Sequence, residues 1–357
     1  MQIEKIACSF QIEGTPVACH EFGSGHINYT YKVVTDASRE YVLQRINKFV
    51  FKDPVRLMEN AGAVTDFLRT RVEDSRMALH FIPTYDNKFY FKDDRDEYWR
   101  MYDFIGGFCL DAPESDADFY ESAVAFGRFQ HMLSDFPAHT LFETIPNFHN
   151  TIDRYRQLKE SINRDECGRL EGVREDVNFM LDREDLACTL QRLLDNGELP
   201  LRVTHNDTKL NNVLLDKKTR KSLCVLDLDT VMPGLSLYDF GDSIRFGAAT
   251  AAEDEKDLSK MELDLHLFEV YTRGFLEAAT SLTDREVELL PLGAFVITIE
   301  LATRFMKDYL DGDHYFKIAY PEHNLDRARS QMKLAADMQA KFDDMNRIVA
   351  EVAAKVR

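Results

Sequence analysis

The spacing of apolar residues changes once along the chain, and this change constrains the fold more than any other feature. Four short aromatic and β-branched runs near the N-terminus predict strands: 29–34, 41–46, 89–91 and 98–104. Asp53-Pro54 predicts a helix start between them, with Pro54 at the first helical position. Beyond residue 115 helical spacing prevails, as in the apolar stripe from Val124 to Leu133. We therefore expect an α+β chain whose strands are concentrated near its N-terminus.

The length of the chain favours two lobes. Its 357 residues exceed the size at which a single core stops growing, about 250–300 residues. Ile105-Gly106-Gly107 is the first candidate hinge after the strand-rich part. We expect a small lobe over residues 1–105, with an antiparallel sheet and a helix, and a large, mainly helical lobe over 106–357.

Charge and composition exclude several classes of protein. The 44 basic and 62 acidic residues give a formal net charge of −18, which disfavours nucleic acid and anionic membranes because both select basic patches. The six cysteines form no C-x-x-C pair, so reduced thiols are expected. The longest apolar stretch, 289–299, is too short for a membrane span and predicts a buried helix. With a charged N-terminus that does not resemble a signal peptide, the chain is expected to be soluble and cytoplasmic.

The C-terminal residues predict an amphipathic helix. Its apolar positions alternate steps of four and three residues: Met338, Phe342, Met345, Val349, Val352 and Val356. The stripe is shorter than the roughly three or four heptads that are typical of a coiled coil. We therefore expect this helix to pack on its own lobe.

The densest polar cluster, THNDTKLNN at 204–212, stands directly before an apolar run at 213–215. A second run at 223–228 follows the turn 217–220, and the two runs predict a hairpin embedded in the helical lobe. Asp207, Asn212 and Asp227 taken singly are ordinary turn residues. Together they place carboxylate and amide oxygens before and after a hairpin, which suits Mg²⁺.

The spacing of His205, Asp207 and Asn212, H-x-D-x-x-x-x-N, resembles the catalytic loop of aminoglycoside phosphotransferases, choline kinases and, more distantly, protein kinases. Asp227-Leu228-Asp229 resembles the metal-binding D-x-D of this family. Further runs resemble the sugar kinases of the family that phosphorylate N-acetylhexosamines at C1: THNDTKLNN, DLDT, YDFGDSIRFG, DGDHYF and YPEHNL. This similarity extends from Gly23 to near the C-terminus in the same order.

The resemblance implies a bilobal, protein-kinase-like fold and an ATP- and Mg²⁺-dependent transfer of the γ-phosphoryl group to N-acetylglucosamine or N-acetylgalactosamine. Asp207 would orient the acceptor hydroxyl and accept its proton. Asn212 and Asp227 would hold Mg²⁺. His205 would brace the loop, and Asp229 would support it or bind the metal through water.

The resemblance also implies that the N-terminal lobe binds the nucleotide. The implied residues come from a glycine loop, a strand and a hinge: Gly23, Ser24, Gly25, Asn28, Gln44, Met101, Tyr102, Asp103 and Phe104. Glycines would let backbone amides approach phosphate oxygens closely. Where kinases carry a strand lysine this chain has Gln44, with Arg45 on the other face, so the nucleotide must be held differently.

The acceptor is expected to bind the helical lobe. Glu300 and Arg304 lie four apart on an apolar helix, where charges are costly unless they meet a polar group, and this favours a pocket. The resemblance adds His26, Asp242 and Tyr315. Aminoglycoside, choline or homoserine acceptors stay open as alternatives, as does a regulatory pseudokinase that only binds nucleotide. Oligomeric state is left open.

Overall fold

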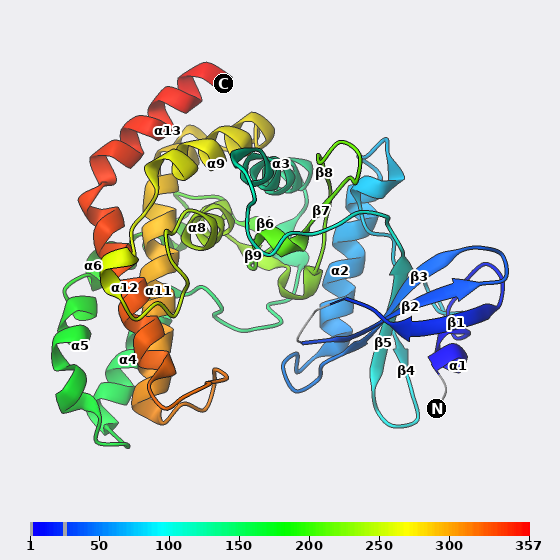
Figure 1. Cartoon of the computed structure of the whole chain (residues 1–357), viewed down its shortest axis with the longest axis horizontal. Coiled ribbons are helices and arrows are strands. Elements are labelled where there is room, and N and C mark those ends of the chain that lie inside the picture. Colours follow the sequence, from blue (N-terminus) through cyan, green and yellow to red (C-terminus); the bar gives the residue numbers. More distant parts are fainter. Residues whose placement is uncertain (1–2, 24–26) are drawn as a thin grey trace. The chain divides into compact units, whose positions relative to one another are not determined.

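We analysed a computed structural model of the chain, which describes residues 3–23 and 27–357. The chain forms two compact units, shown in Figure 1, and neither is contiguous in sequence. The first unit comprises residues 1–109, 135–146 and 212–233, and the second comprises 110–134, 147–211 and 234–357. The sequence predicted one boundary, after residue 105, between two contiguous lobes. That division stays a prediction.

The first unit is built on a five-stranded antiparallel sheet of order β1-β2-β3-β5-β4. Its strands are β1 (Pro16–Glu21), β2 (Tyr29–Thr35), β3 (Glu40–Ile46), β4 (Phe91–Lys92) and β5 (Tyr98–Asp103). The strands predicted at 29–34, 41–46 and 98–104 are confirmed within one residue at each end. The fourth predicted strand begins later than expected, at Phe91.

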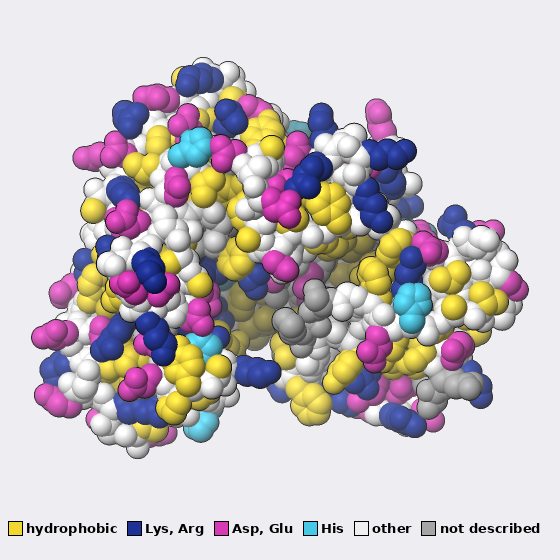
Figure 2. Space-filling model, in the orientation of Figure 1, with side chains coloured by type: hydrophobic (Ala, Val, Ile, Leu, Met, Phe, Trp, Pro, Cys, Tyr) yellow, Lys and Arg dark blue, Asp and Glu magenta, His cyan; other side chains and the backbone are white. Residues whose placement is uncertain are grey.

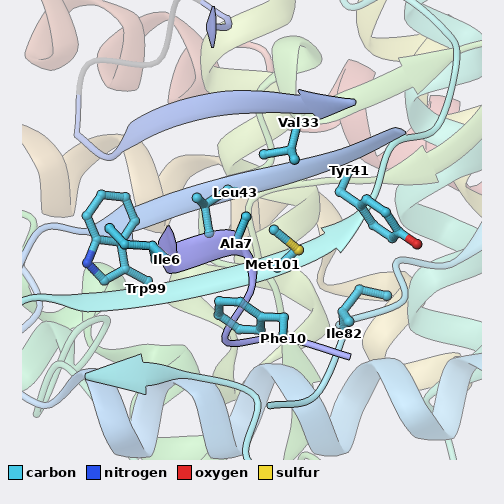
Figure 3. Packing of buried hydrophobic residues seen from close by; sticks show 9 residues of the cluster. All are labelled: Ile6, Ala7, Phe10, Val33, Tyr41, Leu43, Ile82, Trp99 and Met101. Atoms are coloured by element: carbon cyan, nitrogen blue, oxygen red, sulfur yellow. The ribbon is translucent and has the colours of Figure 1, made fainter. Parts of the chain in front are cut away.

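One cluster of apolar side chains closes a face of this sheet. Figure 3 shows the helix α1 (Ile3–Ala7) and the residues after it lying against strand residues. The cluster consists of Ile6, Ala7, Phe10, Val33, Tyr41, Leu43, Ile82, Trp99 and Met101, all buried. Burial of this apolar surface fixes which side chains of β3 and β5 face the core, because a shift of one residue would reverse them.

Helix α2 (Pro54–Arg69) joins the later segments to the first unit. Its start agrees with the prediction: Asp53 caps it by accepting a hydrogen bond from the Arg56 amide at 3.1 Å, and Pro54 lies in the first turn. The buried Asn60 side chain donates to the carbonyls of Phe142, at 2.8 Å, and Val231, at 3.0 Å. One amide thus connects both discontinuous segments to α2.

The predicted hairpin exists as β7 (Val213–Leu215) and β8 (Ser222–Val225). Residues 212–233, which include this hairpin, group with the first unit, and the predicted lobe boundaries stay a prediction. The reason for the grouping is a backbone pairing far along the chain: Leu215 and Phe108 exchange hydrogen bonds of 2.8 and 3.1 Å. Beyond β8 follow the 3₁₀ turn η5 (Leu228–Thr230) and β9 (Met232–Gly234).

The second unit is helical apart from the short strand β6 (Arg202–Thr204). Its helices are α3 (Asp116–Met132), α4 (Thr151–Arg164), α5 (Arg174–Leu181), α6 (Glu184–Ala187), α7 (Thr189–Asp195), α8 (Ser236–Gly247), α9 (Leu265–Ala278), α10 (Asp284–Glu288), α11 (Leu290–Asp311), α12 (His323–Ala340) and α13 (Phe342–Val356). In Figure 1, α11 lies among α4, α8 and α12. The buried helix predicted at 289–299 is thus the first half of α11.

The helices α8 and α11 approach so closely that only glycine fits where they cross. A Cβ on Gly241 would lie 2.5 Å from the carbonyl oxygen of Gly293, and one on Gly293 would lie 2.6 Å from that of Leu237. This contact fixes α8 against α11 and with it the polar side chains that both helices carry.

The predicted C-terminal helix is two helices, so the expectation of one continuous element is wrong. The chain bends at Lys341, between α12 and α13. The Lys341 ammonium donates to Asp337 at 2.7 Å and to the Leu263 carbonyl at 2.9 Å, contacts that hold the bend. Helix α13 packs on α9 of its own unit, as expected.

Figure 2 shows acidic and basic side chains interspersed over the visible face of the helical unit. Within the described residues, no helix has the length and apolar character needed to span a membrane.

Candidate active site

The loop after β6 is held in shape by a buried carboxylate from α8. Both oxygens of Asp239 accept backbone hydrogen bonds, from His205 at 2.9 Å and from Asn206 at 2.8 Å. The Gln130 side chain adds a third at 2.6 Å. Burial raises the pKa of Asp239, while these hydrogen bonds favour its ionised form. Asn206 takes a left-handed conformation, φ 65°, which this carboxylate stabilises immediately before Asp207.

His205 is enclosed by protein groups. Its ring lies edge-on to Phe126 and Phe129 of α3, with centroids 5.4 and 6.0 Å away. Its Nδ1 accepts a hydrogen bond from the Asp207 amide at 3.3 Å. The imidazole is therefore placed to support the backbone of the loop.

A cavity of about 400 Å³ opens in the second unit, a size typical of small-molecule sites. Side chains predicted from the sequence as catalytic or acceptor-binding line it together: Asp207, Asp242, Glu300 and Arg304. Tyr315 does not line the cavity, but its ring lies 6.0 Å from the Arg304 guanidinium. His26 lies outside the described residues.

Carboxylates on the cavity wall pair with neighbouring cations. Asp207 lies 2.8 Å from the Lys209 ammonium, and Arg245 bonds to Asp242 at 2.9 Å and Glu253 at 2.7 Å. Burial alone would raise the pKa of Asp242, but Arg245 and Lys209 hold it below its ordinary value. Burial would likewise lower the pKa of Lys209, and Asp207 raises it instead. Charged side chains of both signs therefore line the cavity wall near Asp207.

Glu300 is anchored on both oxygens. One accepts from Thr151 Oγ1 at 2.9 Å, and the other lies 2.9 Å from Nδ1 of His149. Only 1% of its surface is exposed. Burial would raise its pKa, yet the adjacent His149 holds it below its ordinary value. Glu300 thus fixes the orientation of the His149 ring, which itself lines the cavity.

Arg304 has a different environment. Its guanidinium lies over the rings of Phe148, at 5.1 Å, and Phe316, at 5.6 Å, as well as near Tyr315. Such aromatic faces stabilise a cation. Among the described residues, no hydrogen-bond or ion-pair partner occupies its N–H groups. Arg304 therefore presents donors to the cavity.

The loop that carries two of these rings is fixed by Asp308. Its carboxylate accepts backbone hydrogen bonds from His314, Tyr315 and Phe316 at 3.0, 2.8 and 2.9 Å. The Asn324 side chain donates to the same carboxylate at 2.9 Å. The position of the aromatic rings around Arg304 thus depends on a buried acid one turn further along α11.

In the first unit, polar side chains form a network around Asp229. One oxygen of Asp229 accepts from the Asn28 amide at 2.6 Å, and the other is hydrogen-bonded to Arg100. Arg100 Nε donates to the Gln44 carbonyl oxygen at 2.9 Å, and Gln44 donates to Thr30 at 3.0 Å. The engagement of both oxygens favours a supporting part for Asp229 over metal binding.

Asn212 and Asp227 stand at the open end of the β7–β8 hairpin. The Leu226 amide donates to the Asn212 carbonyl at 2.8 Å, which places Asp227 next to that strand end. Asp227 is exposed and left-handed, φ 58°, whereas Asp229 is buried. Among the described residues no cluster of three acidic, histidine or cysteine side chains could enclose a metal. One carboxylate and one amide instead suit Mg²⁺ that also binds phosphate oxygens.

Gly23 follows β1, and the predicted hinge residues Met101 to Phe104 lie at the end of β5 in the same sheet. Gly23 has φ 83°, a conformation that favours glycine, and a Cβ there would meet no atom within 4 Å. Phe22 packs edge-on against Phe104, with centroids 5.6 Å apart. The Met101 side chain is buried in the core, and Asp103 bonds to His80. Ser24 and Gly25 lie outside the described residues, so the nucleotide contacts stay predictions.

Sequence reasoning missed Arg100, His149 and the role of Asp239. An arginine inside the aromatic run 98–104 was a signal that could have marked Arg100 as a polar contact. His149 lacked any such signal, because its partner Glu300 lies 151 residues away.

A model of the phosphotransferase enzyme family matches residues 18–269, and the chain belongs to that family. An aminoglycoside phosphotransferase from Alicyclobacillus acidocaldarius is similar in structure, with a TM-score of 0.64, 13% identity and coverage of 98% of this chain and 97% of its own.

Two further structures have the same fold. A microcompartment-associated aminopropanol kinase has a TM-score of 0.60 and 15% identity, covering 96% of this chain and 98% of its own. Amicoumacin kinase hAmiN has a TM-score of 0.57 and 12% identity, covering 99% and 92%. These similarities confirm the predicted α+β, protein-kinase-like fold.

Proposed function

We propose that this protein is an ATP- and Mg²⁺-dependent kinase that phosphorylates the C1 hydroxyl of an N-acetylhexosamine. Membership in the phosphotransferase enzyme family supports the transfer reaction. Use of ATP is supported by the similar fold of the amicoumacin kinase, which was solved with the ATP analogue AMP-PNP. The motif resemblance supports the sugar acceptor.

Asp207 is the base in this proposal. Its carboxylate lines the cavity, so it can accept a hydrogen bond from an acceptor hydroxyl placed there. Phosphoryl transfer has a loose transition state, so orienting the hydroxyl matters more than strong basicity. The Lys209 ammonium pairs with this carboxylate at 2.8 Å and so helps to fix its position in the cavity. Asp239 maintains the loop backbone that directs Asp207.

Asn212 and Asp227 would hold Mg²⁺. The ion would bind the phosphates of ATP, the phosphoryl donor, and offset their negative charge. The exposed Asp227 carboxylate offers the charged ligand, and Asn212 offers a neutral oxygen. Glycine-loop and hinge residues on the sheet would hold the nucleotide: Gly23, Ser24, Gly25, Asn28, Gln44, Met101, Tyr102, Asp103 and Phe104.

The observation that carries the choice of acceptor is the free guanidinium of Arg304. The cavity wall holds five cations, Lys209, Arg245, Arg304, Lys317 and Arg327, and four carboxylates. Its carboxylates face cationic or imidazole partners, so the unbalanced charge is positive. A cationic amine would be repelled there, whereas the carbonyl and hydroxyl oxygens of a neutral sugar can accept hydrogen bonds from Arg304.

The proposal is tested by identifying the product. The protein is incubated with ATP, Mg²⁺ and N-acetylglucosamine or N-acetylgalactosamine, and the product is analysed by phosphorus NMR. We expect a phosphorus signal coupled to the anomeric proton. A 6-phosphate would overturn the C1 assignment, and ATP turnover that ignores sugar would overturn the sugar acceptor.

A further inference from the structure

The chain lacks the strand lysine of other kinases, and the side chain at that place has a specific neighbour. Gln44 of β3 lies directly opposite Arg100 of β5 in the antiparallel register. Residues in such a pair lie on the same face of a sheet. The Gln44 carbonyl oxygen accepts from Arg100 Nε at 2.9 Å, and its amide donates to Thr30 at 3.0 Å. The bond to Thr30 thus fixes the Gln44 side chain, and its carbonyl oxygen orients Arg100.

Arg100 is a buried cation in a small sheet. Only 2% of its surface is exposed, and its Nη1 contacts Asp229 and, at 3.8 Å, the sulfur of Met58. A buried guanidinium is stable only when paired, and Asp229 supplies the opposite charge. A positive charge therefore lies one strand away from the place where other kinases carry it.

The pair connects elements that the proposed nucleotide site uses. Asp229 also accepts from Asn28 at 2.6 Å, and Asn28 in turn accepts from the Asn47 amide at 3.0 Å. Asp229 lies two residues after Asp227, which has the uncommon left-handed conformation. Such a conformation persists where the surrounding structure fixes it. Here the bonds to Asp229 hold the central residue of the short turn η5, which directly follows Asp227.

We propose that Arg100, oriented by Gln44, replaces the strand lysine as a positioning residue: it binds Asp229 and thereby fixes Asp227 for the metal. This inference rests on the proposed nucleotide and Mg²⁺ site, and it is independent of which acceptor is used. Arg100 acts through Asp229 and needs no contact with phosphate. In this chain the cation that organises the site is Arg100 on β5, whereas other kinases carry it at the place of Gln44 on β3.

If the proposal is correct, a lysine at position 44 should replace the cation of Arg100. Arg100→Gln leaves Asp229 buried without a cation, and Gln44→Lys adds a second cation beside Arg100. Each single variant should bind MgATP about 10–100-fold more weakly, the usual effect of losing a supporting partner of a metal site. The double variant Gln44→Lys/Arg100→Gln carries one cation facing Asp229, so it should bind MgATP at least tenfold better than either single variant.

MgATP binding is measured by calorimetry without acceptor, so failure of the sugar assignment would leave this test intact. Arg45→Gln is the matched control, because Arg45 is adjacent, lies on the other face and stacks over Tyr29. It should bind MgATP like the wild type. Arg100→Lys, which keeps the charge, serves as a second variant if Arg100→Gln does not fold, and should bind better than any folded neutral variant.

Rescue in the double variant would support the proposal, because a merely structural arginine would not be replaced by lysine on another strand. A double variant no better than the weaker single variant would overturn it. So would an Arg100→Gln protein that binds MgATP within threefold of the wild type.

Discussion

The two units bury charged side chains in different ways. In the first unit the buried Arg100 and Asp229 are bonded to each other and to neutral amides, while the metal-binding candidate Asp227 is exposed. In the helical unit Asp242, Arg245 and Glu300 are buried in pairs at the wall of a cavity, while the guanidinium of Arg304 lies over aromatic rings.

The difference shows that charges in this protein are buried in two settings, within a bonded network in the first unit and at a cavity wall in the second. A buried pair whose partners are all satisfied fixes geometry, since breaking it would leave a charge without compensation. A charge that is exposed or held only by ring faces retains donors or acceptors for a ligand. Arg304 is such a residue, whereas Asp207 lies at the cavity beside its own partner, Lys209.

The largest expected effect comes from the base. Asp207→Asn keeps the shape of the side chain but removes the proton acceptor, so kcat should fall by a factor on the order of 10²–10⁴. Turnover is measured by ADP release under saturating ATP and sugar, with MgATP affinity as the check on folding. A kcat within threefold of the wild type would remove Asp207 from this role.

Arg304→Met should come next. The variant keeps the apolar contacts with the rings of Phe148 and Phe316 but removes the donors. We expect kcat/KM for sugar to fall by an amount equal to about 2–4 kcal/mol of transition-state binding, with MgATP affinity unchanged. Arg347→Met on the exposed face of α13 is the control. Equal kcat/KM values for the two variants would place the acceptor elsewhere.

The contrast between exposed and buried acids in the first unit is sharpened by Asp227→Asn. Loss of the carboxylate should raise the Mg²⁺ concentration needed for half-maximal activity about tenfold or more. Asp96→Asn is a matched control, because Asp96 is also an exposed acid of the first unit with a left-handed backbone, φ 64°. The Mg²⁺ titration of this control should follow the wild type; a shared shift in both would contradict a specific metal ligand.

The smallest effect tests whether packing of the helical unit supports the pocket. Gly241→Ala places a methyl group against the backbone of Gly293, and the free energy of unfolding should fall by about 1–3 kcal/mol. Gly172→Ala, where a Cβ meets nothing within 4 Å, should leave it almost unchanged. Thermal unfolding of both variants provides the measurement, and a stable Gly241→Ala protein would show that α8 can shift.

Much of the fold could be predicted because local signals agree with it. Asp53-Pro54 specifies the start of α2 by capping and by a fixed φ. β1 was not predicted because its run PVACHE lacks the aromatic and β-branched pattern of the other strands and lies, mostly exposed, at the edge of the sheet. The bend at Lys341 has no glycine or proline signal, since it results from a side-chain bond to Leu263, 78 residues away.

The residues of the candidate site likewise fall into those that the sequence could mark and those that only long-range contacts reveal. Asp207, Asn212 and Asp227 stand in two motifs that lie close together in the sequence, so spacing alone could mark them. Arg100 and Asp229 are 129 residues apart, and the charge of one is explained only by contact with the other. Glu300 and Arg304 were correctly expected on one face, yet the sequence did not show that Glu300 bonds to Thr151 while Arg304 faces the cavity.

Acceptor preference is the most direct test of the claim that a cavity whose unbalanced charge is positive selects a neutral sugar. ADP release is measured with N-acetylglucosamine, N-acetylgalactosamine, kanamycin, choline and ethanolamine at equal concentrations. We predict that kcat/KM for at least one N-acetylhexosamine exceeds that for every amine by tenfold or more, a difference of about 1.4 kcal/mol. A preference for any of the cationic acceptors would contradict the claim.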